Sequence, residues 1–167
     1  MKYPPLLFCL LVTCVSQAQY YISFAPALTN TAGTIAEKSN VALEIGKQWN
    51  VFSLGVDIGK TSLSRVTGRD TTTYFEIRPN LNIFQQGRFT NTFTAGIGYI
   101  AGAKDNLITE LTSGIEYSWT DQIHVNANFG QYFYSGRYDA FNVTYFGLSF
   151  MYYFVPYNNR SSIIKPK

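Results

Sequence analysis

The sequence predicts an all-β fold: an eight-stranded antiparallel up-and-down transmembrane β-barrel with a polar interior filled by side chains. Three observations support this prediction. Apolar and polar residues alternate with a period of two in segments from residue 20 to residue 154. Aromatic residues make up 17% and charged residues only 14% of the chain, against about 25% charged residues in ordinary globular proteins. Mean hydropathy is only −0.04, and after the N-terminus no apolar run reaches the ~18 residues of a membrane helix.

The first 18 residues have the pattern of a signal peptide. Lys2 precedes a short apolar core at 6–15, and residues 16–18 (Ser-Gln-Ala) fit a small-x-small cleavage site. The alternative is lipoprotein processing before Cys14, because residues 11–14 loosely resemble a lipobox. Both cysteines lie in this segment, so a mature chain beginning at residue 19 has no disulfide, thiolate nucleophile or cysteine metal ligand.

The expected barrel domain spans residues 19–154, followed by a short periplasmic tail at 155–167. Each expected strand is near the ~9–11 residues that a tilted strand needs to cross a bilayer. No helical period of 3.6 competes with the alternation. The expected strands are 20–28, 40–49, 52–60, 73–84, 89–101, 107–119, 123–134 and 141–154.

The connections alternate between short and longer segments. Outer-membrane barrels have tight periplasmic turns and longer outer loops, so this order predicts that both termini are periplasmic. Short connections are expected at 50–51, 85–87 and 120–122, and longer ones at 29–39, 61–72, 102–106 and 135–140.

Side-chain parity sets the length of two of these turns, because cross-strand partners share a face. Outward residues are odd-numbered before Asn50 and even-numbered after Val51, which requires a two-residue turn, and Asn50 suits one. Around 85–87 the outward residues are odd-numbered on both sides. This predicts a three-residue connection, with Gly87 where a bulge needs a positive φ.

Large apolar residues are expected to face lipid, and charged, amide and glycine residues to face the interior. Lys47 is an exception that faces outward near a turn, where it can extend toward water. A soluble lipocalin-like ligand-binding barrel, the structural alternative, would reverse this arrangement. The expected outward residues include Leu43, Ile45, Leu54, Val56, Ile58, Phe93, Ile97, Leu111, Ile115, Phe129, Phe146, Leu148 and Phe150.

Interior charges are expected to form a network around Arg78, the only inward-facing arginine near mid-depth. Asp57 and Glu76 are its expected neighbours across one hairpin, and Glu44 approaches from the adjacent strand. An eight-stranded barrel is just wide enough to be filled by its side chains, so the network is interpreted as structural filling. A narrow ion path or gate is the alternative. The predicted network consists of Glu44, Asp57, Glu76, Arg78, Glu110 and Glu116.

Aromatic residues next to the short turns predict a periplasmic girdle. Four others, Tyr74, Tyr99, Phe133 and Phe141, are expected to mark the opposite rim. Pro79 falls in mid-strand without an N–H to donate, and we expect a bulge or a local break in pairing there. The predicted girdle consists of Trp49, Phe52, Phe84, Phe89 and Trp119.

The segment 145–152 resembles the C-terminal β-signal of bacterial outer-membrane proteins. Its members here are Tyr145, Gly147, Phe150 and Tyr152, followed by the terminal aromatic residue Phe154. With the strand count, the chain resembles the small eight-stranded barrels typified by outer membrane protein X and the transmembrane domain of outer membrane protein A. The resemblance implies recognition by the outer-membrane assembly machinery.

The predicted function is a non-enzymatic role in the bacterial outer membrane: envelope structure, surface contact or a narrow passage. We expect a monomer that contacts outer-membrane lipids and lipopolysaccharide and needs no cofactor or metal. The net charge of +3 is spread out and gives no nucleic-acid surface. A lipid A-modifying barrel enzyme is the alternative. However, His124 is the only histidine, Glu116 is its one candidate partner, and the residues after it lack the His-x-Ser pattern of lipid A deacylases.

Overall fold

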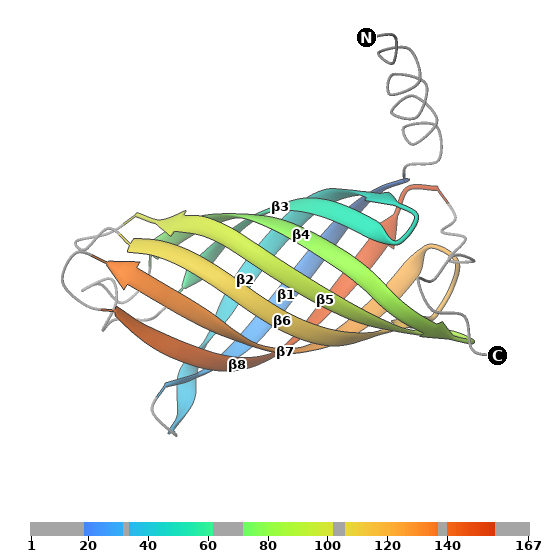
Figure 1. Cartoon of the computed structure of the whole chain (residues 1–167). Coiled ribbons are helices and arrows are strands. Elements are labelled where there is room, and N and C mark those ends of the chain that lie inside the picture. The colour runs from blue at the N-terminus through green and yellow to red at the C-terminus, as the bar shows by residue number, and fades with distance from the viewer. Residues whose placement is uncertain (1–18, 32–33, 62–71, 102–105, 137–139, 156–167) are drawn as a thin grey trace, which may run out of the picture.

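The computed structural model describes residues 19–31, 34–61, 72–101, 106–136 and 140–155. Eight antiparallel strands pair in sequence order and close into a barrel (Figure 1). Within the described residues, no helix is long and apolar enough to cross a membrane. The strands are β1 (Gln19–Thr31), β2 (Thr34–Trp49), β3 (Phe52–Thr61), β4 (Thr72–Gln86), β5 (Phe89–Ile100), β6 (Asn106–Ser118), β7 (Ile123–Gly136) and β8 (Ala140–Tyr153).

The predicted strand number and order are confirmed, but the predicted loop at 29–39 is wrong. Residues 29–39 were expected to form a loop, but β1 and β2 continue through most of this segment and pair up to Thr31 and Thr34. The resulting hairpin projects beyond the neighbouring strands (Figure 1). Alternation could not reveal this extension, because a strand segment beyond the barrel wall needs no lipid-facing side.

The two faces of the wall have the predicted polarity. Along β2, Leu43 and Ile45 are exposed on the outside, whereas Glu44 between them is buried inside. The same alternation holds for Val56 and Asp57 on β3. A large apolar exterior around a polar lumen suits lipid and not water, so the lipocalin-like alternative is wrong.

The turn at Asn50 and Val51 has the predicted two-residue length. Trp49 pairs with Phe52, and Asn50 has a φ of 54°. A positive φ at a central turn residue matches the twist of the flanking strands, and asparagine tolerates this conformation better than most residues.

The next short connection differs from the prediction. Gln86 pairs with Phe89, so the turn consists of the two residues Gly87 and Arg88, with Gly87 at a φ of 60°. The extra residue that parity requires lies instead in a bulge at Ile83, where the register shifts between Asn82 and Phe84. Parity counts residues between strands but does not say where an unpaired residue lies.

Pro79 causes a local break in pairing without a change of register. Pro79 pairs with Leu54 on β3, but the β4–β5 ladder has no paired residues between Ile77↔Ile97 and Asn80↔Thr94. Pro26 has the same effect on the β1–β8 ladder, which is interrupted between Phe24 and Ala27. Each proline keeps one neighbouring strand and interrupts the ladder on the other side, as expected of a residue without an N–H.

The remaining connections are described in part. The turn after β6 spans 119–122, where the carbonyl oxygen of Ile123 accepts hydrogen bonds from the N–H groups of Trp119 and Thr120. Most of the expected loops at 61–72, 102–106 and 135–140 lies outside the described residues. So do the expected signal peptide at 1–18, which includes Cys14, and all of the expected tail beyond Val155.

We predict that Asn50→Val destabilises the barrel by about 1–2 kcal/mol, because a β-branched residue is strained at positive φ. Asn50→Gly is the matched control, since glycine adopts this conformation without a Cβ clash. Urea unfolding of the refolded protein measures both. Equal stability of the valine and glycine variants would contradict the turn geometry.

Candidate functional site

Three strands bring one arginine and two glutamates together in the middle of the lumen. Arg78 on β4 donates from Nη1 to Oε2 of Glu44 on β2 at 2.7 Å. Its Nε and Nη2 donate to Oε2 and Oε1 of Glu110 on β6 at 2.8 and 2.9 Å. The second pair is bidentate, which adds geometric specificity to the charge attraction.

Hydroxyl groups satisfy the remaining positions on both carboxylates. The Tyr21 hydroxyl donates to Oε1 of Glu44 at 2.5 Å. The hydroxyls of Thr112, at 2.7 Å, and Tyr145 donate to Oε1 of Glu110. We call this set the central cluster: Tyr21, Glu44, Arg78, Glu110, Thr112 and Tyr145. Buried charges that are paired and fully hydrogen-bonded avoid most of the desolvation cost.

The expected partners of Arg78 are only partly those observed. Glu44 is a direct partner, but Asp57 and Glu76 are not among its hydrogen-bond partners. Asp57 accepts from the Tyr74 hydroxyl at 3.1 Å instead. The prediction chose Asp57 and Glu76 because they lie on the same hairpin as Arg78. The arginine side chain is long enough to reach across the narrow lumen to β2 and β6 instead.

Glu76 is fully buried, and neither of its carboxylate oxygens has a hydrogen-bond partner among the described residues. It lies against β5, where a Cβ on Gly96 would come within 2.1 Å of its Oε1. Likewise, a Cβ on Gly55 would come within 1.9 Å of Oε1 of Glu44. Glycines in the wall therefore make the room that the lumen carboxylates occupy.

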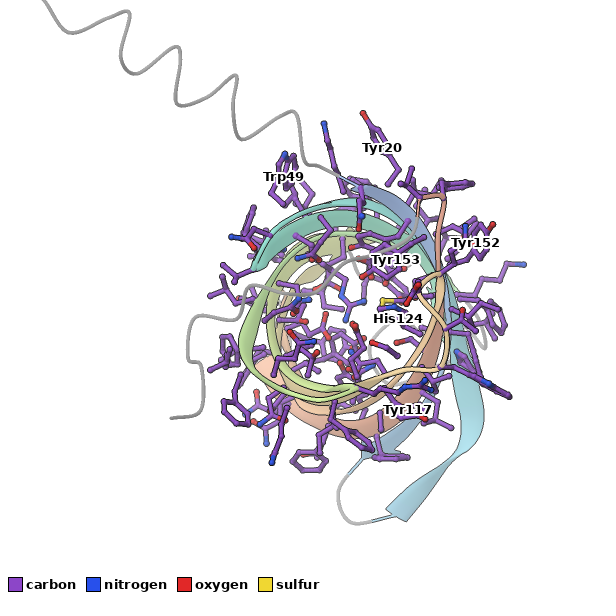
Figure 2. All side chains as sticks on the ribbon, turned by 90° about the vertical axis from the view of Figure 1, so that its right-hand side faces the viewer. Tyr20, Trp49, Tyr117, His124, Tyr152 and Tyr153 are labelled. Carbon is purple, nitrogen blue, oxygen red and sulfur yellow. The ribbon has the colours of Figure 1, made fainter. Side chains whose placement is uncertain are left out.

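Glu116 forms a separate pair with His124 toward the end of the barrel with the short turns. His124 Nδ1 and Glu116 Oε1 are 2.6 Å apart, and both side chains are almost completely buried. The ring of Tyr153 packs 4.8 Å from the imidazole. Viewed from this end, His124 and Tyr153 lie inside the barrel (Figure 2). An acid–histidine pair enclosed in this way is out of reach of a lipid outside the wall.

A layer of buried tyrosines and aliphatic residues lies inside the barrel toward the loop end, a feature that the sequence analysis missed. Tyr132 stacks on Tyr145 with ring centroids 4.6 Å apart. Tyr74 belongs to this layer, so its expected place on the outer rim is wrong. Strand parity contains the signal, because these residues share a face with the glutamates. The layer consists of Ala42, Tyr74, Ile100, Ile108, Tyr132, Tyr134, Val143 and Tyr145.

Two small cavities lie on either side of Arg78. One, of about 30 Å³, extends toward the short turns and is lined by polar groups such as Gln48, Ser53 and Asn126. The other, of about 20 Å³, lies toward the tyrosine layer and is bordered by Asp57 and Tyr74. Each has room for about one or two water molecules. The central cluster therefore separates two water-sized spaces.

The fold has clear structural relatives, although the sequence matches no protein-family model and no curated protein sequence. The crystal structure of Neisserial surface protein A is similar with a TM-score of 0.58 at 9% identity, over 81% of this chain and 96% of that one. The crystal structure of the N-terminal β-barrel domain of Pseudomonas aeruginosa OprF gives 0.56 at 11%, over 80% and 97%. The solution NMR structure of the de novo designed TMB2.3 gives 0.55 at 11%, over 84% and 98%.

The chain has the fold of the small eight-stranded outer-membrane β-barrels. Identities of 9–11% support the likeness in fold and nothing finer. One of these similar structures is a designed protein. Similarity in fold to these structures therefore does not identify a physiological role for this chain.

The expected girdle residues of this outer-membrane barrel fold lie around the short-turn end. Phe52, Phe89 and Trp119 are exposed, whereas Trp49 and Phe84 are half-buried. The rings of Trp49 and Phe52 stack 5.9 Å apart across the first short turn. Such amphipathic and apolar rings suit the boundary between hydrocarbon and headgroups.

The expected β-signal residues occupy both faces of β8 and its end. Tyr145 points inward to the central cluster, and Gly147 is buried. Phe150 and Tyr152 face outward, and Phe154, which follows the strand, is 58% exposed. The backbone N–H of Phe154 donates to the carbonyl oxygen of Tyr20 at 3.1 Å. Recognition by the assembly machinery remains a prediction.

Side chains that could bind a metal ion are not grouped together in the part of the chain that the structure describes. No group of three or more histidine, aspartate or glutamate side chains there is placed to hold a metal ion.

We predict that Arg78→Ala destabilises the barrel by about 3–5 kcal/mol, because it leaves two buried carboxylates without their cation. The folded band on a semi-native gel should then be lost at a lower temperature. Lys60→Ala, at an exposed outward position on β3, is the matched control. An unchanged melting temperature for Arg78→Ala would refute the central role of this arginine.

Proposed function

We propose that this protein is a non-enzymatic outer-membrane barrel that acts as a closed structural support for segments at the cell surface. The observation that carries the proposal is the filled lumen: the central cluster crosses it at mid-depth, and the tyrosine layer fills it toward the loop end. Such a barrel anchors its connections in the membrane without offering a wide channel.

The orientation follows from the connections. Short turns join β2 to β3, β4 to β5 and β6 to β7, and they share one end of the barrel with the start of β1 and the end of β8 (Figure 1). By the general rule for outer-membrane barrels, this end is periplasmic. The projecting β1–β2 hairpin then lies on the cell surface, which supports a surface-contact role.

A lipid A-modifying activity is less well supported. The candidate pair of His124 and Glu116 is 1% and 2% exposed inside the wall. It also lies near the periplasmic end, whereas lipid A belongs to the outer leaflet. A catalytic group must come within hydrogen-bond reach of its substrate, and this pair is enclosed.

Cell fractionation combined with a heat-modifiability gel tests the proposal. We expect the protein in the outer-membrane fraction, with a band that shifts on boiling, because a folded barrel binds less detergent than the unfolded chain. Lipid A from cells with and without the protein should have the same acyl chains by mass spectrometry. A soluble periplasmic protein, or altered acyl chains, would overturn the proposal.

We also predict that the purified protein in planar bilayers gives no steady open-channel current, because the lumen is filled. The Tyr132→Ala/Tyr134→Ala variant, which truncates two buried side chains of the tyrosine layer, should also give no steady current, because the central cluster still crosses the lumen. A steady current from the unmodified protein would favour the passage role over the closed support.

A further inference from the structure

Lys47 is held in a defined position on the outer wall of the barrel. Its Nζ lies 5.0 Å from the ring centroid of Tyr20 and 5.3 Å from that of Trp49. Tyr20 is its cross-strand partner on β1, and Trp49 ends the same strand. Figure 2 shows both rings on the outside of the barrel at the short-turn end. Two cation–π contacts restrict where the ammonium group can lie.

Within the part of the chain that the structure describes, the positive charge of Lys47 is not neutralised by a neighbouring residue. Among the described residues, no carboxylate pairs with it, and the charged network lies on the other side of the wall. Its cross-strand partner on β3 is Leu54, and Ile45 lies next on its own face of β2. An ammonium group beside an apolar wall favours an anion that brings its own apolar part.

The aromatic rings add polar groups at the same level. The indole N–H of Trp49 and the hydroxyl of Tyr20 are hydrogen-bonding groups at the border of the apolar belt. Below them, exposed apolar side chains continue along the wall toward mid-depth, including Ile45, Leu43 and Val56. This strip runs in the direction that an acyl chain takes when its headgroup lies at Lys47.

We propose that Lys47, Tyr20 and Trp49 form a site for the headgroup phosphate of an anionic diacyl phospholipid. The site rests on the proposed membrane role, which places the short-turn end at the periplasmic leaflet. It adds to that role the class of lipid that this end would bind. An anionic lipid is preferred over a zwitterionic one, since a single uncompensated cation selects net negative charge. Pre-positioning by the two rings lowers the entropy lost when the headgroup binds.

Fluorescence quenching by brominated lipids tests the site. The chain has two tryptophans, so Trp119→Phe leaves Trp49 as the only indole. This protein is reconstituted into phosphatidylcholine bilayers that contain phosphatidylglycerol, with one or the other lipid brominated near the glycerol end of its acyl chains. Quenching as a function of composition gives the relative binding constant of phosphatidylglycerol at Trp49.

We expect phosphatidylglycerol to bind at Trp49 more tightly than phosphatidylcholine. In a Lys47→Gln variant the relative binding constant should fall by about fivefold, which is the effect of about one basic residue near a lipid surface. Lys60→Gln, a lysine exposed near the other end of the barrel, should leave the constant unchanged. Tyr20→Leu, which removes one ring, should give a smaller decrease. It also provides a second variant if Lys47→Gln does not fold on a heat-modifiability gel.

Each outcome bears on one of the two proposals. Equal constants for the two lipids, or equal losses in the Lys47 and Lys60 variants, would refute the phospholipid site while leaving the membrane role intact. Absence of quenching by every brominated lipid would show that Trp49 lies away from the bilayer. That result would overturn the membrane role, and the lipid site with it.

Discussion

Closure of the sheet between its first and last strands is the constraint on which the structure depends. The β1–β8 ladder joins Ile22 to Tyr152 and Thr29 to Tyr145, so the sheet has no long unpaired edge within the wall. In hydrocarbon an unpaired N–H or C=O group costs several kcal/mol, and only closure satisfies every strand at once. Pro26 and Pro79 each interrupt the ladder with one neighbouring strand only, and the register is the same on both sides of each interruption.

Closure at eight strands also determines what the lumen can contain. The interior of such a barrel is about as wide as its own side chains, so inward residues from distant strands must meet. Arg78 contacts Glu44 and Glu110, which are 34 and 32 residues away in the sequence. The same crowding explains why Gly55 and Gly96 lie opposite carboxylates that a larger residue would displace. The charged side chains that fill this lumen are therefore the same ones that pair with one another across it.

The outer wall is subject to a different constraint, because it has to match a bilayer along its height. Aliphatic residues such as Ile45 and Ile97 cover the middle, and aromatic residues such as Trp119 gather at one end. Lys47 lies where these two zones meet, with its charge against aromatic rings and its stem along the apolar wall. The polar lumen and the lipid-facing wall thus have separate chemistries within one layer of backbone.

The sequence by itself determined the fold class, the eight strands, the polarity of the two faces and the turn at Asn50, because each depends on a period of two or on a few neighbouring residues. It did not determine the partners of Arg78, the position of the bulge at Ile83 or the stacking of Tyr132 on Tyr145. These depend on the tilt of the strands and on which side chains meet across the closed lumen. Only the tertiary structure decides that, since alternation states which face a residue occupies but not what it meets there.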